Sequence, residues 1–342
     1  MKNNKKNDPG FWKMARSFLH DYMPKVRNLS DKSVKSYKQS LNAYLGFLQS
    51  ELCIERSEVT FECFSRKNIK DYIAWMQLEN GYSPKTVNLR ITAIKSFLKF
   101  CAEEDFTLAL FHTAVYSIKG IKESKKPILY LTRKAITTLL GIVGTSTAKE
   151  RRNRMLLILM YDSAARVREL ADLTIADLHI TGPHPFITLT GKRNKVRNVP
   201  LMNKTVEHLK IYLSEFHKFL GNQPLFYSIR DGKPHALSTD SISLILKKNA
   251  DEARKRCIEI PVEMHCHLIR KTRAMDLYQQ GIPLPIVMQI LGHESMSTTS
   301  SFYAFATVEM MHEAMARANP SAIGELPKWK NKKYMQALYS LD

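Results

Sequence analysis

Apolar residues recur at intervals of three and four along most of this 342-residue chain, the period that places them on one face of an α-helix. Between about Pro9 and Ile118 the pattern predicts a bundle of four or five helices without strands. Ser30 precedes one helix as a candidate N-cap, and Ser83-Pro84 is typical of the N-cap and first residue of another. A third helix, Asn68–Leu78, is followed by Asn80-Gly81, a typical helix end.

A second patterned block follows the basic segment Lys119–Pro127, which we interpret as a linker. This block predicts one β-hairpin, in which Phe186–Thr190 and Val196–Val199 flank the basic turn Gly191–Lys195. Its helical patterns cover residues 132–143, 149–161, 204–220, 238–257, 267–280, 285–291 and 307–318. The predicted fold class is therefore mainly α, with a small β-hairpin or sheet.

The two blocks predict a domain boundary near residue 122. A helical domain would cover residues 1–122, a second domain residues 123–325, and a tail residues 326–342. The tail carries four lysines, followed by the apolar Met335, Leu338 and Tyr339. We expect it to form a short helix that docks on a partner surface.

The net charge narrows the classes of function that this chain could have. The 52 Lys and Arg exceed the 32 Asp and Glu by 20, which favours binding to a polyanion, either a nucleic acid or an anionic membrane surface, over a generically basic soluble surface. The longest apolar run, Met155–Tyr161, is far shorter than the roughly 18 residues that span a bilayer. We expect no membrane segment and no signal peptide, a cytoplasmic location, reduced cysteines and no structural metal.

Four separated segments of the second block carry groups suited to a phosphodiester. Arg166 lies in a break between an apolar run and the next helix, where its guanidinium could grip two phosphate oxygens. Lys192 lies at the tip of the predicted hairpin. His267 and Arg270 are three residues apart, so a helix would project both from one face. The last segment begins at Leu291-Gly292-His293 and continues to Tyr303.

The order and spacing of these segments resemble the tyrosine recombinases, the family of phage integrases and Xer-type resolvases. The resemblance rests on Arg166 before Glu169-Leu170, Lys192 after Gly191, the His267–Arg270 pair, Leu291-Gly292-His293, and the Ser-Thr-Thr of residues 297–299 ahead of Tyr303. It covers about residues 130–310. It implies an N-terminal helical core-binding, SAM-like domain and a C-terminal α+β catalytic domain, which together form a C-shaped clamp around duplex DNA.

The resemblance also implies a mechanism and partners. Tyr303 would attack the scissile phosphate to give a 3′-phosphotyrosine ester, with His267 as base and Lys192 as the acid for the leaving 5′ oxygen. Arg166 and Arg270 would clamp the phosphate, and His293 would hydrogen-bond it. Glu169 would orient its neighbours. No metal or other cofactor is implied. The partners would be double-stranded DNA with a specific site and a homo-tetramer on two such sites, in integration, excision or transposition of a mobile element.

The sequence departs from the family pattern at three points. The usual spacing would place the tyrosine at position 302, which is Phe302, so Tyr303 requires one extra residue in a preceding loop. Lys271, often a histidine, and Arg273, commonly an apolar residue, should add charge near the site. Lys195 competes with Lys192 for the lysine role, and we favour Lys192 because it follows Gly191.

Three other functions compete with recombination. A type IB topoisomerase shares the chemistry but relaxes supercoils as a monomer. A DNA-binding regulator could keep the fold without catalysis, which the shifted Tyr303 makes conceivable. A metal site at His265-Cys266-His267 is weaker, because this spacing lacks further ligands at a standard distance.

Overall fold

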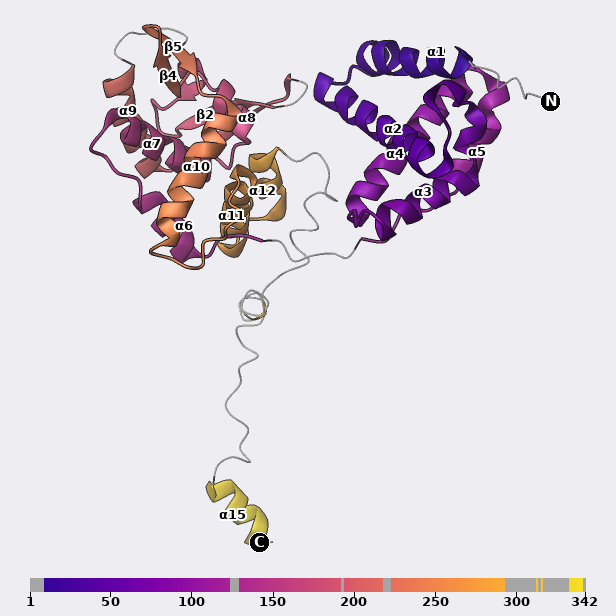
Figure 1. The fold of residues 1–342 in the computed structure, drawn as a ribbon. Helices are drawn as coiled ribbons and strands as arrows, with labels where there is room; N and C mark the ends of the chain where they lie inside the picture. The colour runs from indigo at the N-terminus through magenta and orange to yellow at the C-terminus, as the bar shows by residue number, and fades with distance from the viewer. Residues whose placement is uncertain are drawn as a thin grey trace, which may run out of the picture. The chain divides into compact units, whose positions relative to one another are not determined.

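The computed structural model describes residues 9–123, 129–191, 194–217, 223–292, 312, 315 and 332–340. The chain divides into two compact units, Met1–Lys126 and Pro127–Asp342, which are shown in Figure 1. This division falls inside the basic segment that the sequence indicates as a linker. No helix among the described residues is both long enough and apolar enough to cross a bilayer.

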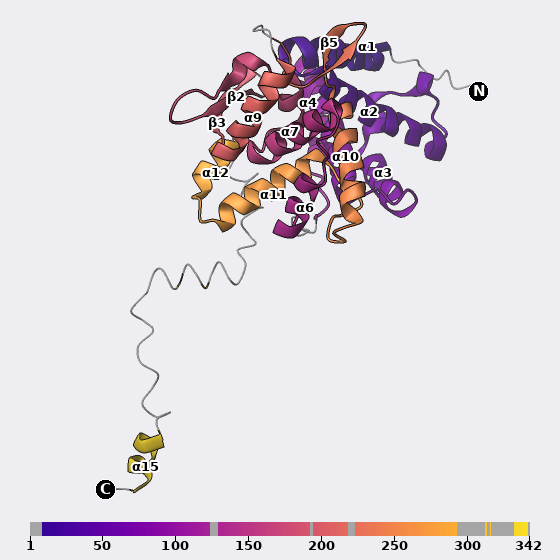
Figure 2. The ribbon, with the colours of Figure 1, turned by 90° about the vertical axis from the view of Figure 1, so that its left-hand side faces the viewer.

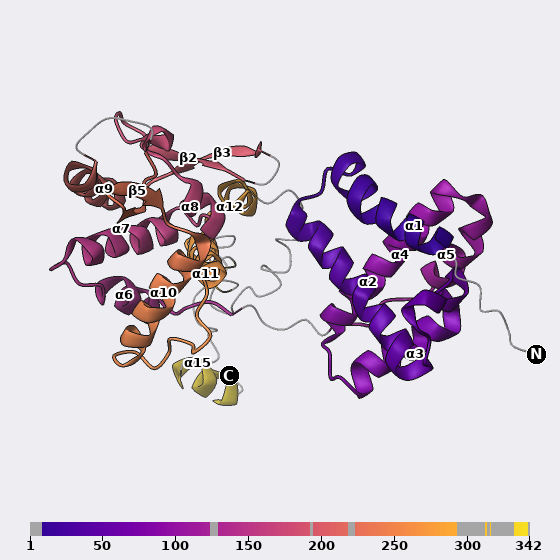
Figure 3. The ribbon, with the colours of Figure 1, turned by 45° about the horizontal axis from the view of Figure 1, so that its top comes forward.

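The described part of the first unit is entirely helical. Its helices are α1 (Pro9–Ser17), the π-helix η1 (Phe18–Val26), α2 (Asp31–Leu52), α3 (Arg66–Leu78), α4 (Pro84–Glu104) and α5 (Ala109–Tyr116), with short 3₁₀ turns at η2 (Arg56–Glu58), η3 (Phe61–Phe64) and η4 (Phe106–Leu108). Helix α4 packs against α2, α3 and α5 and is the centre of this unit, as Figure 3 shows. Its core is rich in fully buried aromatic rings, among them Phe18, Tyr44, Phe64, Tyr72 and Phe97.

The predicted helix starts of this unit are correct except for two details. Ser83 caps α4 by accepting a hydrogen bond from the Thr86 N–H at 3.3 Å. Ser30 occupies the N-cap position of α2, but its hydroxyl pairs with the Ser33 hydroxyl at 3.1 Å and caps no backbone N–H. Helix α3 begins two residues before the predicted start, because Ser65 is its N-cap.

In the second unit the strands lie at the edge of a group of helices, as Figure 2 shows. Its helices are α6 (Arg133–Gly141), α7 (Ala148–Asp162), α8 (Val167–Asp172), the 3₁₀ turn η5 (Ile175–Asp177), α9 (Asn203–Phe216), α10 (Thr239–Arg254), α11 (Cys266–Gln279) and α12 (Leu284–Leu291). Its strands are β1 (Leu178–His179), β2 (Phe186–Thr190), β3 (Val196–Pro200), β4 (Tyr227–Arg230) and β5 (Lys233–Ala236). The tail contains α15 (Lys332–Ser340).

The strands form two antiparallel sheets, β1-β2-β3 and β4-β5. The predicted hairpin is confirmed as β2–β3, with Phe186 opposite Pro200 and Thr190 opposite Val196. Strand β1 and the β4–β5 hairpin were not predicted. The predicted helix over residues 307–318 lies outside the described residues, apart from His312 and Met315.

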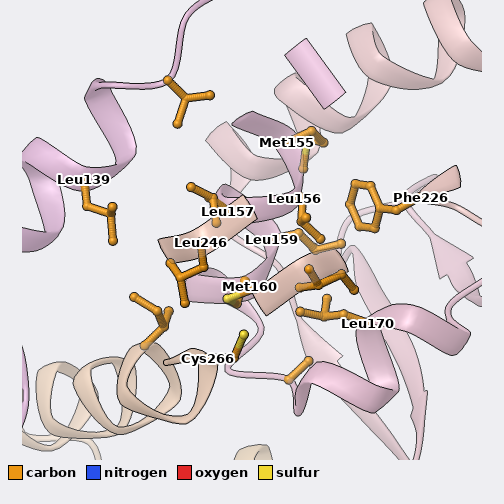
Figure 4. Packing of buried hydrophobic residues seen from close by; sticks show 14 of the residues in the cluster. Leu139, Met155, Leu156, Leu157, Leu159, Met160, Leu170, Phe226, Leu246 and Cys266 are labelled. Atoms are coloured by element: carbon orange, nitrogen blue, oxygen red, sulfur yellow. The ribbon is translucent and has the colours of Figure 1, made fainter. Parts of the chain in front are cut away.

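Helix α7 forms the centre of the second core. Met155, Leu156, Leu157, Leu159 and Met160 are all buried, so the C-terminal half of the helix is apolar around most of its circumference and must be enclosed. Figure 4 shows these residues surrounded by side chains of other elements, which include Leu139, Leu170, Phe226, Leu246 and Cys266. The well-packed helix ends at Asp162, and the segment with Arg166 follows immediately.

Candidate functional site

The turn between α7 and α8 fixes the position of Arg166. Ala164, fully buried, adopts a left-handed φ of 48°, a conformation that costs an alanine roughly 1–2 kcal/mol. The turn that it makes brings Arg166 to the N-cap position of α8. There the Arg166 backbone N–H donates to Glu169 Oε2 at 2.7 Å, and its Nη1 donates to Glu169 Oε1 at 2.8 Å. One carboxylate therefore holds both the main chain and the side chain of Arg166.

Arg197, on β3, approaches the same carboxylate from the sheet. Its Nη1 and Nη2 donate to the two oxygens of Glu169, each at 2.7 Å, in a bidentate ion pair. The Glu169 side chain is only 2% exposed. Burial alone would raise the pKa of Glu169, but hydrogen bonds from the Arg197 side chain and the Arg166 N–H outweigh it and lower the pKa to about 2. Glu169 is therefore a fully charged anchor between two arginines.

His267 and Arg270 lie in the first turns of α11, which begins after its N-cap His265. The His265 ring accepts a hydrogen bond from the Leu268 N–H at 3.1 Å. Arg270 is buried, and its Nη1 donates to the Ala164 carbonyl at 2.6 Å. This bond connects the HxxR helix to the strained turn that precedes Arg166.

Both residues of this pair have shifted pKa values. Burial, followed by the positive charges of Arg166 and Arg197, lowers the pKa of Arg270 to about 9. The loss of solvation and the charges of Lys271 and Arg270 lower the pKa of His267 to about 4, although part of the His267 ring is exposed. At neutral pH, Arg270 is thus a cation and His267 is a neutral imidazole that can accept a proton.

The C-terminus of α12 orients all three arginines. Arg197 Nε donates to the Ile290 carbonyl at 2.9 Å, Arg270 Nη2 donates to the Leu291 carbonyl, and Arg166 Nη2 donates to the Gly292 carbonyl at 3.2 Å. The last carbonyls of a helix lack intrahelical donors and form its negative end, so cations are favoured there. Three consecutive carbonyls therefore accept bonds from three arginines that belong to three different segments of the chain.

Two glycines bring the chain close to this cluster. Gly292 has a φ of 60°, and a Cβ on it would lie 2.9 Å from Arg197 Cδ. A Cβ on Gly191 would lie 3.3 Å from Glu169 Oε1 and 3.7 Å from Arg166 Nη1. Lys192 follows Gly191 and His293 follows Gly292 in the sequence, so the described chain reaches the cluster at the residue before each of them.

The structure brings together Arg166, His267 and Arg270 of the predicted site. Lys192, His293 and Tyr303 lie outside the described residues. Lys195 is exposed, and its carbonyl accepts a hydrogen bond from the Gly191 N–H at 2.7 Å across the hairpin turn. Sequence reasoning missed Arg197, whose only signal was a single basic residue in the predicted strand, next to a turn that already contained several.

Lys271 and Arg273 were both expected to add positive charge near the site, but only Lys271 does so. Lys271 contributes positive charge to the surroundings of His267. Arg273 does not add uncompensated charge, because it is buried and its Nη2 pairs with Asp162 Oδ1 at 3.0 Å. Within the described residues, no group of three or more His, Cys, Asp or Glu is arranged to hold a metal ion.

Two known protein families match the sequence of this chain. The model described as "Phage integrase family" matches residues 130–309, and the model described as "Phage integrase, N-terminal SAM-like domain" matches residues 17–105. The tyrosine recombinase XerC of Staphylococcus haemolyticus is 27% identical over 297 residues, covering 86% of this chain and 93% of that protein.

Two solved structures share the fold. The XerH site-specific recombinase bound to a palindromic difH substrate, in a post-cleavage complex, aligns with a TM-score of 0.67 at 19% identity and covers 92% of this chain and 91% of that chain. The Tn1549 transposon integrase in complex with transposon right end DNA aligns with a TM-score of 0.65 at 16% identity, covering 89% of this chain and 99% of that chain. At these identities the likeness concerns the fold.

Proposed function

Since the chain belongs to the phage integrase family and is a tyrosine-type site-specific DNA recombinase, we propose that it cuts and rejoins duplex DNA through a 3′-phosphotyrosine intermediate. One observation carries this proposal. Arg166 and Arg270 both donate to the C-terminus of α12, one residue before His293 in the sequence, and the charges of both act on the neutral His267. Two arginines and one neutral imidazole are the groups needed to bind a phosphodiester and accept a proton beside it.

The proposed roles follow from the chemistry of each group. A tyrosine hydroxyl has a pKa near 10, so Tyr303 requires a base, and we assign this role to His267, whose ring is neutral at pH 7. Arg166 and Arg270 stabilise the charge that develops on the non-bridging oxygens. Lys192 protonates the leaving 5′ oxygen, and His293 donates a hydrogen bond to the phosphate. Glu169 keeps Arg166 in place through its two hydrogen bonds.

The remaining parts of the chain have proposed roles in assembly. Residues 1–122 form the helical core-binding domain that reads DNA, and residues 123–325 form the catalytic domain. The tail 326–342, which contains α15, docks on a neighbouring copy in a tetramer on two DNA sites. The event is integration, excision or transposition of a mobile element. The relatives do not favour a type IB topoisomerase or an inactive regulator.

A nicked suicide substrate tests the nucleophile. We expect Tyr303→Phe to abolish the covalent protein-DNA adduct while DNA binding is retained, because only the hydroxyl is removed. The site can be selected from the DNA that flanks the gene, and the adduct measured by denaturing gel electrophoresis. Tyr116→Phe, at an exposed tyrosine of the first unit, is the matched control and should form adduct normally. An adduct that persists in Tyr303→Phe would assign the attack to another residue.

The same assay tests the phosphate clamp. Arg166→Ala should lose cleavage by roughly 100-fold or more, the range for loss of one charge-stabilising donor. Arg168→Ala is the control, because Arg168 is exposed and pairs with Asp172 at 2.7 Å away from the cluster. Normal cleavage by Arg166→Ala would remove this residue from the proposed mechanism.

A further inference from the structure

A buried ion pair joins two segments that carry the arginine cluster. Arg273 Nη2 is 3.0 Å from Asp162 Oδ1, and Arg273 Nε donates to the Asp162 carbonyl at 3.3 Å. The side chains of Asp162 and Arg273 are 1% and 11% exposed. The guanidinium carbon also lies 5.2 Å from the centre of the Tyr161 ring, so one face of the cation is covered by an aromatic ring. The pair is enclosed and well oriented.

The Asp162 carboxylate connects three segments of the second unit. Asp162 is the last residue of α7, and its Oδ1 binds Arg273 of α11. Its Oδ2 accepts a hydrogen bond from the backbone N–H of Met202 at 2.9 Å, and Met202 joins β3 to α9. A single side chain therefore fixes the end of α7, the middle of α11 and the end of β3 relative to one another.

Each of these segments carries a member of the arginine cluster. Arg166 follows Asp162 by four residues, Arg270 precedes Arg273 by three, and Arg197 lies on the strand that ends shortly before Met202. Three residues are close to one turn of helix, so Arg270 and Arg273 lie near one face of α11. A shift of Asp162 relative to Arg273 would thus move Arg166 relative to Arg270.

Stability alone does not explain why charges are buried at this point. Removing two charges from water is costly, and replacing a buried ion pair with apolar side chains is often neutral or stabilising. An ion pair is directional, whereas an apolar contact is not. It therefore fixes the angle and the distance between the two segments that it joins. A pair that is neutral for stability can therefore still determine the geometry of groups nearby.

We propose that Asp162 and Arg273 are positioning residues, which set the register between the two arginines that bind the scissile phosphate. The proposal rests on the function assigned to Arg166 and Arg270. Neither Asp162 nor Arg273 contacts the reacting atoms in this assignment. They act through the turn at residues 163–165 and through α11.

The decisive variant replaces both charges together. Asp162→Ala/Arg273→Met leaves no unpaired buried charge, but it removes the acceptor of the Met202 N–H, so we expect a modest loss of melting temperature and a DNA affinity close to that of the wild type. Its single-turnover cleavage rate on the nicked substrate should fall by roughly 10- to 100-fold, because displacements of about 1 Å have such effects on rates. Arg151→Met/Glu215→Ala is the matched control. It removes a different ion pair of α7, from Arg151 Nη2 to Glu215 Oε1 of α9 at 2.6 Å, and should cleave normally.

A modified substrate separates positioning from general damage. A methylphosphonate at the scissile position lacks one charged oxygen, so cleavage of it depends less on the arginine clamp. The rate deficit of the double variant should shrink on this substrate, as should that of Arg166→Ala. A double variant that cleaves ordinary DNA at the wild-type rate would overturn the proposal. So would a deficit that stays the same on the methylphosphonate while that of Arg166→Ala shrinks.

A conservative variant covers the case in which the double variant does not fold. Arg273→Lys keeps the charge but lacks the planar fork that contacts both the carboxylate and the carbonyl of Asp162. We expect a smaller loss of cleavage with DNA binding intact, and a wild-type rate would contradict the positioning role. If Arg166→Ala itself cleaves normally, the phosphate-binding role assigned to Arg166 under the proposed function fails instead, so the two failures are distinguishable.

Discussion

At the scale of single residues, Glu169 determines most of the site's electrostatics. Its carboxylate is the common acceptor for Arg166 and Arg197, and it is almost fully enclosed. Two cations so close to each other would repel without it. The negative charge of one buried side chain thus makes a dense group of guanidinium groups possible in a protein that already carries a net charge of +20.

This arrangement predicts how stability depends on pH. The folded-state pKa of Glu169, about 2, lies below its reference value of 4.5, so the stabilisation is complete above pH 4.5 and is lost as the pH falls towards 2. The shift corresponds to about 3 kcal/mol. Glu169→Gln should lose an amount of this order at pH 7 and should show a weaker decrease in stability between pH 5 and 2. Urea denaturation at a series of pH values measures both.

The control for this prediction is Glu252→Gln, which removes an exposed partner of Lys255. Exposed pairs contribute little, so this variant should follow the wild type at each pH. Parallel stability curves for Glu169→Gln and the wild type would show that Glu169 is not the titrating anchor.

The residues that could be predicted from the sequence differ in one physical respect from those that were missed. Arg166, His267 and Arg270 belong to a pattern of residue types at fixed spacing, so they could be predicted. Arg197 and the Asp162–Arg273 pair act through partners that are distant in the sequence, and nothing local distinguishes a buried arginine from an exposed one. Arg273 was therefore expected to add charge, whereas its partner, 111 residues earlier in the chain, compensates it.

At the scale of elements, the last turn of α12 is the part on which the arginine cluster depends. The carbonyls of its last two residues and of its C-cap Gly292 are in place as acceptors while Gly292 ends the helix in a left-handed conformation. The helix itself is short and largely apolar, and Val287 and Leu291 are its buried residues. We therefore expect small changes at its end to affect catalysis more than folding.

Gly292→Ala tests this expectation. The alanine must adopt a φ of 60°, at a cost of roughly 1–2 kcal/mol, and its Cβ would displace the Arg197 side chain. We expect a modest loss of thermal stability and a larger loss of cleavage. Gly232→Ala, in the β4–β5 turn, is a matched control with a φ of 72° and no atom within 4 Å of the new Cβ. Equal cleavage by the two variants would show that α12 does not orient the arginines.

The sequence predicted the long helices better than the short strands. Long helices with a three-and-four apolar pattern were found, because one buried face requires that spacing. Strand β1 has two residues and is too short to show an alternating pattern. The β4–β5 hairpin did carry a signal in Asp231-Gly232, whose positive φ values of 50° and 72° suit a tight hairpin turn, and this signal was overlooked.

At the scale of the whole molecule, the protein has a separate main core in each unit and a large positive charge. Each unit has its own buried cluster, centred on α4 in the first unit and on α7 in the second. Only a few of the 52 basic residues are used in the arginine cluster. In the proposed function, many of the others neutralise phosphates along the duplex.

This use of charge predicts a strong dependence of DNA affinity on salt. If about 6–10 phosphates are neutralised, affinity should fall by about 10³–10⁵-fold between 50 and 200 mM salt. Fluorescence anisotropy with Tyr303→Phe measures binding without cleavage. A duplex that lacks the recombination site should give a similar slope at lower affinity, since phosphate contacts carry no sequence information. A flat salt dependence would contradict this use of the charge.

The three arginines on consecutive carbonyls of α12 have a geometric consequence. Ile290 and Leu291 are successive residues of α12, offset by about 100° and 1.5 Å, and Gly292 is its left-handed C-cap, so the positions of the three acceptors follow from the pitch of α12 and the turn that ends it. A deletion of one residue within α12 would rotate these acceptors as a unit, and no substitution in the arginine-bearing segments could restore them. The helix thus serves as a template, and homologues that alter its length are expected to alter the loop at residues 163–165 with it.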